Sequence, residues 1–189
     1  EEIIGSCFTC LAAAALALTA VFWLSGEKQL WLFGCSEDTI VYALPYMRIY
    51  ASGSFFVMMA LGMNLFITTQ GFTSFSMKTV LIGAVTNIVL DPIFIYLLDM
   101  GVQGAALATV ISQAVSGIWV VRFLAGPKTK LRLRRQWMRP RAAVMGPVLA
   151  LGLAPFIMQA TEALLNISFN SSLQRYGGDI AVGAMTVAS

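Results

Sequence analysis

The sequence predicts an all-α polytopic membrane protein, and two observations support this fold class. Hydrophobic residues make up 58% of the chain and charged residues only 11%, whereas a soluble domain has about 25% charged residues. The charges also leave uncharged runs over 3–26, 49–77 and 101–121. Each run is long enough for a helix that crosses a bilayer, which requires about 20 mostly apolar residues.

The boundaries of the spans follow from where charges and turn residues interrupt the apolar sequence. In chain order the apolar segments cover about 3–25, 44–69, 79–98, 102–123, 144–173 and 180 onward. The first five are complete spans, and the sixth is only the start of one. Because the chain opens with Glu1 and Glu2 and ends inside an apolar run, we expect it to be an internal part of a longer protein.

The basic residues predict the orientation of these spans. Eight of the twelve Lys and Arg residues lie between Arg122 and Arg141 with no acid among them, so the positive-inside rule places this segment in the cytoplasm. Lys78 then lies on the cytoplasmic side as well, whereas the loop 27–38 and the turn at Asp99 lie outside. A basic run could also bind nucleic acid, but beside a span it is more typical of a topology determinant that touches anionic lipid. We therefore expect membrane lipid, and no nucleic acid, as a partner.

Two acids, Asp91 and Glu162, fall deep inside predicted spans. An ionisable side chain at that depth is costly and usually marks an ion or substrate path; a protonated acid in an interhelical hydrogen bond is the alternative. Asn87 lies four residues before Asp91 and Asn166 four residues after Glu162, so each acid shares a helix face with an amide. Carboxylate and amide oxygens are hard ligands that suit Na⁺, and the carboxylate can hold a proton instead.

Thr109 is expected to lie at the same depth as Asp91. Folding the third and fourth spans about Met100 leaves each residue nine positions from the turn, which is roughly 13 Å at about 1.5 Å per residue. The hydroxyl of Thr109 would then supply a further oxygen. The alternative is a hydrogen bond from this hydroxyl to its own helix.

Pro92 follows Asp91 directly and removes one helix hydrogen bond, which frees the carbonyl of Ile88. We expect a bend there that acts as a hinge beside the ion site; a static kink in a packed helix is the alternative.

In the next span, small residues are expected to let a neighbouring backbone approach closely. These residues are Gly101, Gly104, Ala105 and Ala108.

Cys7 and Cys10 have the CxxC spacing that also occurs in zinc and redox sites. A zinc site needs about four nitrogen or sulfur ligands, and the chain offers only Cys35 besides this pair and no His. We therefore expect no cofactor, and no metal site other than one for Na⁺.

The sequence resembles the MATE family, the multidrug and toxin compound extrusion transporters. The resemblance rests on four segments: NIVLDPIFIY at 87–96, GVQGAALATVISQ at 101–113, GLAPFIMQATE at 152–162 and RYGGDIAVGAMTVAS at 175–189. It implies part of a twelve-helix transporter with two six-helix lobes. Residues 1–125 then resemble helices 3–6 of the N-terminal lobe, 126–143 the basic cytoplasmic linker, and 144–189 helix 7 and the start of helix 8.

The resemblance also implies roles for individual residues. The family's N-terminal lobe holds a cation site, and its Asn, Asp and Thr correspond to Asn87, Asp91 and Thr109. A Tyr that contributes in some members corresponds to Tyr46. A seventh-span acid found in one subgroup corresponds to Glu162, with Asn166 on the same face, as a substrate- or proton-coupling group. That subgroup has Pro eight residues before the acid. This sequence has Ala154 at that position, and Pro155 follows it.

The function implied is secondary active efflux of amphipathic, often cationic, drugs or toxins in exchange for H⁺ or Na⁺. A lipid-linked oligosaccharide flippase of the same superfamily is the alternative, but such proteins carry more basic residues in the central cavity, and the deep charges here are acidic.

No enzyme activity is expected, because aspartyl intramembrane enzymes need two catalytic Asp and metallo types need His. We expect a full-length monomer with multiple spans in the bacterial inner membrane.

Overall fold

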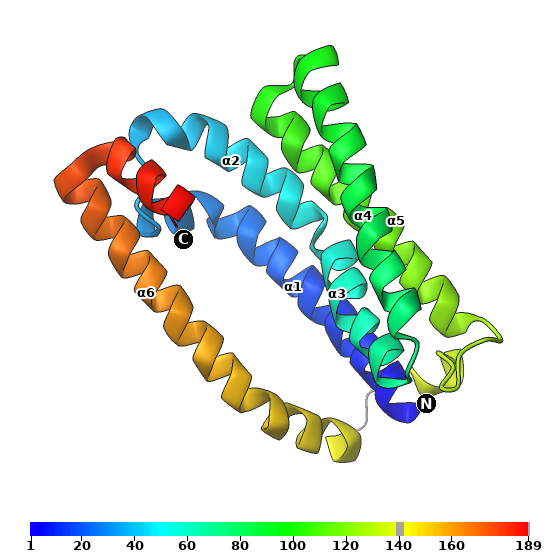
Figure 1. The fold of residues 1–189 in the computed structure, drawn as a ribbon. Coiled ribbons are helices and arrows are strands. Elements are labelled where there is room, and N and C mark those ends of the chain that lie inside the picture. The colour runs from blue at the N-terminus through cyan, green and yellow to red at the C-terminus, as the bar shows by residue number, and fades with distance from the viewer. Residues whose placement is uncertain (139–141, 189) are drawn as a thin grey trace.

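The chain folds into long helices, and the computed structural model describes residues 1–138 and 142–188 (Figure 1). Every regular element of these residues is helical. In chain order they are α1 (Glu2–Leu32), α2 (Glu37–Ser52), α3 (Ser54–Thr69), α4 (Thr73–Pro92), the π-helix η1 (Ile93–Leu97), α5 (Gly101–Ala125), the 3₁₀-helix η2 (Arg135–Trp137) and α6 (Ala142–Ala188).

Four of these helical stretches are long and apolar enough to cross a membrane. They cover Glu2–Leu32, Thr73–Leu97, Gly101–Ala125 and Ala143–Gly178. The pair α2 and α3 meets the same test when taken together, with a bend of 54° between its halves. The predicted fold class, an all-α polytopic membrane protein, is thus confirmed.

The second span differs from the prediction at its start and in its middle. It begins at Glu37 rather than near Leu44, because the Ser36 side chain caps the helix by accepting a hydrogen bond from the Thr39 amide at 3.3 Å. Acidic residues in the first turn suit the positive end of a helix, so Glu37 and Asp38, expected in a loop, belong to α2. The first span is also longer than predicted, because α1 runs to Leu32 and includes Glu27 and Lys28. The helix breaks at Gly53, where an added Cβ would lie 2.5 Å from the Val110 side chain of α5.

The helix α5 is central to the bundle, because it packs against α2, α3, α4 and η1. The core of the described residues lies mainly where α3 and α5 meet, with α1 beside them (Figure 1). Its fully buried side chains include Met59, Met63 and Ile67 of α3, and Val120 and Leu124 of α5.

Small residues of α5 allow close backbone contacts, as the sequence predicts. A Cβ on Gly104 would lie 2.7 Å from the carbonyl oxygen of Phe94, and one on Gly117 would lie 3.2 Å from that of Phe56. Ala108 is buried as well. Gly101 is different, since no atom of the described residues lies within 4 Å of its Cβ position and its φ is +53°. The prediction of a packing role for Gly101 is therefore wrong, and this glycine serves the turn instead.

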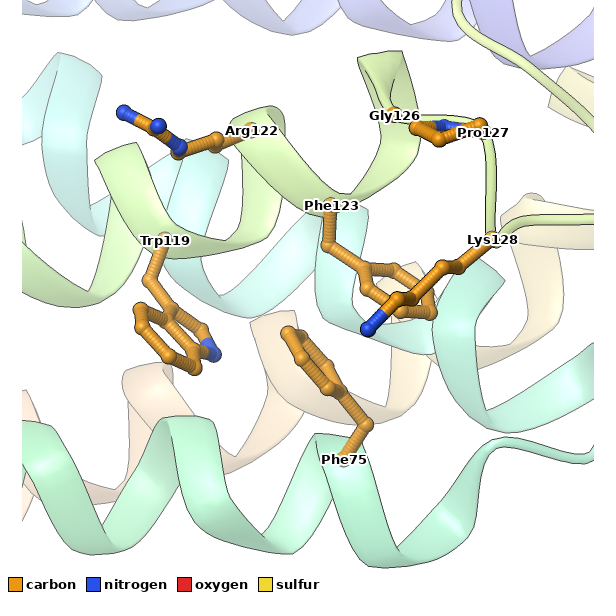
Figure 2. A pocket seen from close by; sticks show the side chains of 7 residues that line it. All are labelled: Phe75, Trp119, Arg122, Phe123, Gly126, Pro127 and Lys128. Atoms are coloured by element: carbon orange, nitrogen blue, oxygen red, sulfur yellow. The ribbon is translucent and has the colours of Figure 1, made fainter.

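An aromatic cluster joins the start of α4 to the end of α5 (Figure 2). Phe75 stacks on Phe123, with ring centroids 3.8 Å apart, and on Trp119, at 5.4 Å. Phe72 meets Phe123 edge-on at 5.4 Å. The cluster fixes how these two helices approach each other at the end where the basic residues gather.

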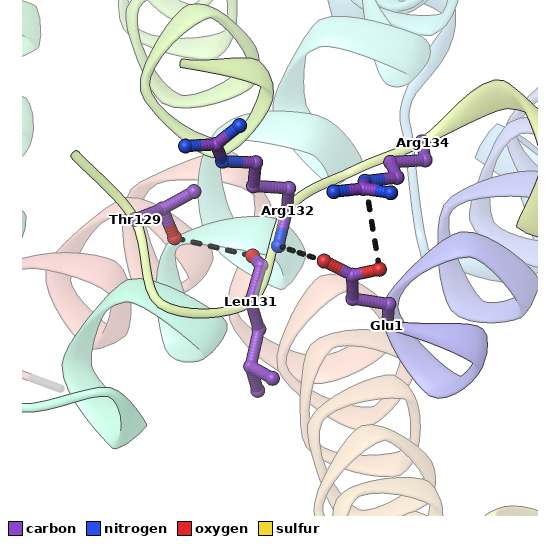
Figure 3. A network of polar contacts seen from close by, with 5 residues as sticks. All are labelled: Glu1, Thr129, Leu131, Arg132 and Arg134. Atoms are coloured by element: carbon purple, nitrogen blue, oxygen red, sulfur yellow. Dashed lines mark hydrogen bonds and ion pairs between the residues drawn. The ribbon is translucent and has the colours of Figure 1, made fainter. Parts of the chain in front are cut away.

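The basic segment after α5 is packed against the helices rather than extended away from them. The side chain of Glu1 accepts a hydrogen bond from the Arg132 amide at 3.3 Å and pairs with the Arg134 guanidinium at 3.6 Å (Figure 3). The side-chain oxygen of Gln70 accepts hydrogen bonds from the Thr129 hydroxyl at 2.7 Å and the Leu131 amide at 2.9 Å. This segment therefore ties the start of α1 and the end of α3 to the end of α5.

The helix α6 lies apart from the bundle formed by α1 to α5 (Figure 1). Among the helices of the described residues it contacts only α1, and the Ser171 hydroxyl donates a hydrogen bond to the Leu32 carbonyl at 3.3 Å. Its backbone leaves helical geometry at Gly178, where φ is +64°. The predicted linker residues 139–141 lie outside the described residues.

The close contact at Gly104 leads to a first prediction about stability. Alanine favours a helix over glycine by about 1 kcal/mol, yet Gly104→Ala should destabilise the full-length protein by about 1–3 kcal/mol, because the new methyl group meets backbone atoms that cannot rotate away. Gly101→Asn is the matched control, since Asn tolerates positive φ and space is open there. Thermal unfolding in detergent should show the larger fall in Tm for Gly104→Ala; a larger fall for Gly101→Asn would contradict the packing argument.

Candidate functional site

Asn87 and Asp91 form the centre of the candidate site on α4. The Asn87 amide nitrogen donates a hydrogen bond to a carboxylate oxygen of Asp91 at 3.1 Å. Both side chains are half-buried. Because the amide nitrogen is the donor, the carbonyl oxygen of Asn87 remains available as an acceptor or as a cation ligand.

A cavity of about 230 Å³ lies next to this pair, between α3, α4 and α5. Since a water molecule takes about 30 Å³ in the liquid, the cavity has room for several waters or a hydrated ion. No Asp, Glu, Lys or Arg is among the described residues that line it. The polar residues of the lining are Asn64, Thr79, Asn87, Thr109, Ser112, Gln113 and Ser116.

Thr109 lines the same cavity as Asn87. Its hydroxyl donates a hydrogen bond to the Ala105 carbonyl of its own helix at 2.9 Å, which is the alternative that the sequence leaves open. This bond uses the hydroxyl proton only, and the oxygen keeps lone pairs with which to bind a cation. The two roles of Thr109 are therefore compatible.

The register between α4 and α5 places Thr109 at a level between those of Asn87 and Asp91. Gly83 lies beside Ser112 and Ser116, whereas Phe94 lies beside Gly104. One turn from Gly83 toward Asp91 therefore reaches Asn87 opposite the turn of α5 that holds Thr109. Counting back from Phe94 beside Gly104 puts Thr109 about two residues from the level of Asp91, so Thr109 lies opposite the turn of α4 that holds both Asn87 and Asp91.

Pro92 does not break the span. The helix continues through it, and Thr73–Leu97 forms one stretch of 25 residues. What changes is the type of helix, from α up to Pro92 to π from Ile93 onward. Short π-helical turns often occur at functional sites, and a hinge at Pro92 stays a prediction.

Tyr46 lies on α2, which packs against α5. It is half-buried and stacks on Tyr50, with ring centroids 6.2 Å apart and planes inclined by 7°. Tyr46 is absent from the described lining of the cavity beside Asn87. Its role as a cation ligand stays a prediction.

Glu162 and Asn166 lie on α6 and are exposed. The structure does not bring them to the cavity beside Asn87, whose described lining residues come from α3, α4 and α5. They share one face of α6, as their spacing predicts. Their function in coupling also stays a prediction.

Asn64 is the residue that the sequence reasoning missed. It lines the cavity from α3, and its side-chain oxygen is buried without a hydrogen-bond partner among the described residues. A buried amide oxygen without a partner is costly, and a bound water or ion commonly satisfies one. The sequence could have indicated Asn64, because it is a polar residue within the uncharged apolar run 49–77. Ser116, whose hydroxyl donates to the Thr79 carbonyl at 3.2 Å, was missed because it resembles a packing residue.

Comparisons with known proteins agree with the fold. The MatE family model matches residues 1–93. The multidrug export protein MepA of Staphylococcus haemolyticus is 29% identical over 174 residues, which cover 91% of this chain and 38% of the relative. MepA of Staphylococcus saprophyticus is 25% identical over 151 residues, covering 80% of this chain and 34% of the relative. The chain thus spans little more than a third of these relatives.

Solved structures show the same arrangement of helices. The MATE multidrug transporter DinF-BH superimposes with a TM-score of 0.94 and 32% identity, covering all of this chain and 42% of that one. An inward-facing MATE family transporter of the MOP superfamily gives a TM-score of 0.84 at 22% identity, over 98% of this chain and 48% of that one; at this identity the likeness shows the fold alone. The family model, the relatives and the solved structures agree, and this multi-pass membrane protein is similar to MATE transporters in sequence and in fold.

Proposed function

We propose that the chain forms part of a secondary active multidrug exporter in which Asn87, Asp91 and the adjacent cavity bind the coupling cation, H⁺ or Na⁺. The observation that carries the proposal is the hydrogen bond from Asn87 to Asp91 beside a polar cavity that Thr109 also lines. Relatives named as multidrug export proteins support the class of transport.

The chemistry of the site suits a small hard cation. A carboxylate, an amide carbonyl and a hydroxyl are oxygen ligands of the kind that Na⁺ accepts, and the carboxylate alone can take a proton. An ionised Asp91 is costly at this depth, and either cation would neutralise it. Occupancy of the site would then shift the balance between two conformations, as alternating access requires.

Pro92 and the π-helix η1 are the proposed location of that conformational change. The chain lacks one backbone donor at Pro92, and the helix type changes at the next residue. This part of the span has fewer regular α-helical hydrogen bonds to break than an uninterrupted helix. The proposal is that α4 bends here when Asp91 gains or loses its cation.

Amphipathic cationic compounds are the proposed substrates, because the ionisable groups deep in the predicted spans, Asp91 and Glu162, are acidic. The exporter would act as a monomer in the bacterial plasma membrane. A lipid-linked oligosaccharide flippase remains the second candidate, and export of a fluorescent cationic dye separates the two.

Asp91→Asn tests the cation site. In the full-length protein this change should lower dye efflux driven by an imposed H⁺ or Na⁺ gradient at least about tenfold, because the neutral amide can neither hold a proton nor balance a cation. Asp99→Asn is the control: it removes the same charge from an exposed turn with φ of +50°, a conformation that Asn tolerates. Undiminished efflux in Asp91→Asn, or an equal loss in Asp99→Asn, would count against the proposal.

Thr109 can be tested by exchanging its hydroxyl for a methyl group of similar size. Thr109→Val should raise the cation concentration that gives half-maximal efflux about tenfold, the effect expected from losing one polar interaction of about 1.4 kcal/mol. Thr109→Ser keeps the oxygen and should stay within about twofold of the wild type. The measurement is the efflux rate against Na⁺ concentration and against pH, and equal curves for Thr109→Val and Thr109→Ser would show that the hydroxyl does not bind the cation.

Glu162→Gln tests the coupling role of the acid on α6. If Glu162 attracts cationic substrate or carries a proton, this variant should slow dye efflux about tenfold and alter its pH dependence. Glu27→Gln, at an exposed position on α1, should leave both unchanged. Transport with an unaltered rate and pH profile in Glu162→Gln would assign this residue a structural role.

A further inference from the structure

A second cavity lies where α4 begins and α5 ends, and it shares no described lining residue with the cavity beside Asn87. It has a volume of about 220 Å³. Three aromatic residues form its wall, two cationic residues lie at its rim, and the chain leaving α5 closes one side (Figure 2). The lining residues are Phe75, Trp119, Arg122, Phe123, Gly126, Pro127 and Lys128.

The aromatic wall is rigid and apolar. Phe75 is held between Trp119 and Phe123, with interplanar angles of 11° and 26°. Trp119 nevertheless keeps 39% of its surface exposed. Stacked rings with an exposed indole at the end of a span are typical of the membrane–water interface, where an aromatic ring meets lipid on one side and headgroups on the other.

The rim carries positive charge that no acid among the described lining residues balances. Arg122 and Lys128 are both exposed, and neither forms an ion pair within the part of the chain that the structure describes. Figure 2 shows the Lys128 ammonium reaching toward the rings of Phe75 and Phe123, while the Arg122 side chain points to the other side of α5. The ion pair between Arg134 and Glu1 involves a different part of the basic segment, so it leaves the charges at this cavity unneutralised.

The position of the cavity indicates lipid as its neighbour. The positive-inside rule assigns this end of α4 and α5 to the cytoplasmic leaflet, whose surface is anionic. The helix surfaces just below the cavity are apolar and open, with Met77, Val80 and Ile118 each 61% exposed. Within the described residues, α6 makes no contact with α4 or α5, so it does not cover this surface.

We propose that this cavity binds one anionic phospholipid of the cytoplasmic leaflet. The phosphate lies beside the Lys128 ammonium, with Arg122 as a second cation at the same end of α5, and the first part of an acyl chain lies on the wall formed by Phe75 and Trp119. Charge complementarity selects an anionic lipid over a zwitterionic one, because the described rim residues offer two cations and no anion. Free phosphate lacks the chain that would use the aromatic wall, so a lipid gains both kinds of contact.

Quenching of Trp119 fluorescence tests the proposal on the full-length protein. The protein is reconstituted in mixed phosphatidylcholine and phosphatidylglycerol vesicles, with bromine on the acyl chains of one lipid or the other. Brominated phosphatidylglycerol should quench more strongly than brominated phosphatidylcholine, and Trp119→Phe should abolish the difference, which separates this residue from the other Trp residues of the chain. Equal quenching by the two lipids in the wild type would overturn the proposal without any variant.

Charge variants then test the rim. Lys128→Gln should lower the preference for phosphatidylglycerol about fivefold, the effect expected for one basic residue at an anionic membrane surface. Arg122→Gln should act in the same direction. Lys130→Gln is the matched control, because it removes one charge from the same exposed segment but does not line the cavity. An equal loss in Lys130→Gln would mean that the basic segment attracts anionic lipid only in general, and would reject a defined site.

Discussion

The close approach of backbones around α5 is the constraint on which the rest of this structure depends. In a bilayer, apolar surface alone does not drive helices together, so association relies on close van der Waals contact and polar contacts between helices. The glycines at 104 and 117 bring α5 against the carbonyl groups of Phe94 and Phe56, and Ser116 hydrogen-bonds to Thr79. Because α5 contacts four other elements, these small residues fix the positions of α2, α3, α4 and η1 at once.

The polar cavity is a product of the same packing. Small and polar side chains of α5 face α3 and α4, and they leave space that larger apolar residues would fill. Asn87 lies on the wall of that space and holds Asp91 through one hydrogen bond. Asn87 therefore connects the acid to a cavity whose described lining is uncharged but rich in hydrogen-bonding side chains.

The sequence predicts the parts of the fold that depend on apolar length, and misses those that depend on neighbours. Apolar length was enough to find the spans, and an acid deep within one of them identified the Asn87–Asp91 pair. The break at Gly53 was not visible, because it reflects contact with Val110 of another helix. The π-helix after Pro92 is not revealed by apolar composition, and Asn64 was missed because its importance comes from the cavity that three helices form.

The docking of the basic segment has a practical consequence for engineering this protein. A loop between two sets of helices is usually the first choice for inserting a tag or cutting the chain, since exposed backbone tolerates change. Here Thr129 and Leu133 are buried, Gln70 accepts two hydrogen bonds from the segment, and the Leu133 amide donates to the Leu124 carbonyl at 2.8 Å. Permissive insertion points are thus better sought in the exposed turn at Asp99 and Met100, between η1 and α5, than in the basic segment after α5.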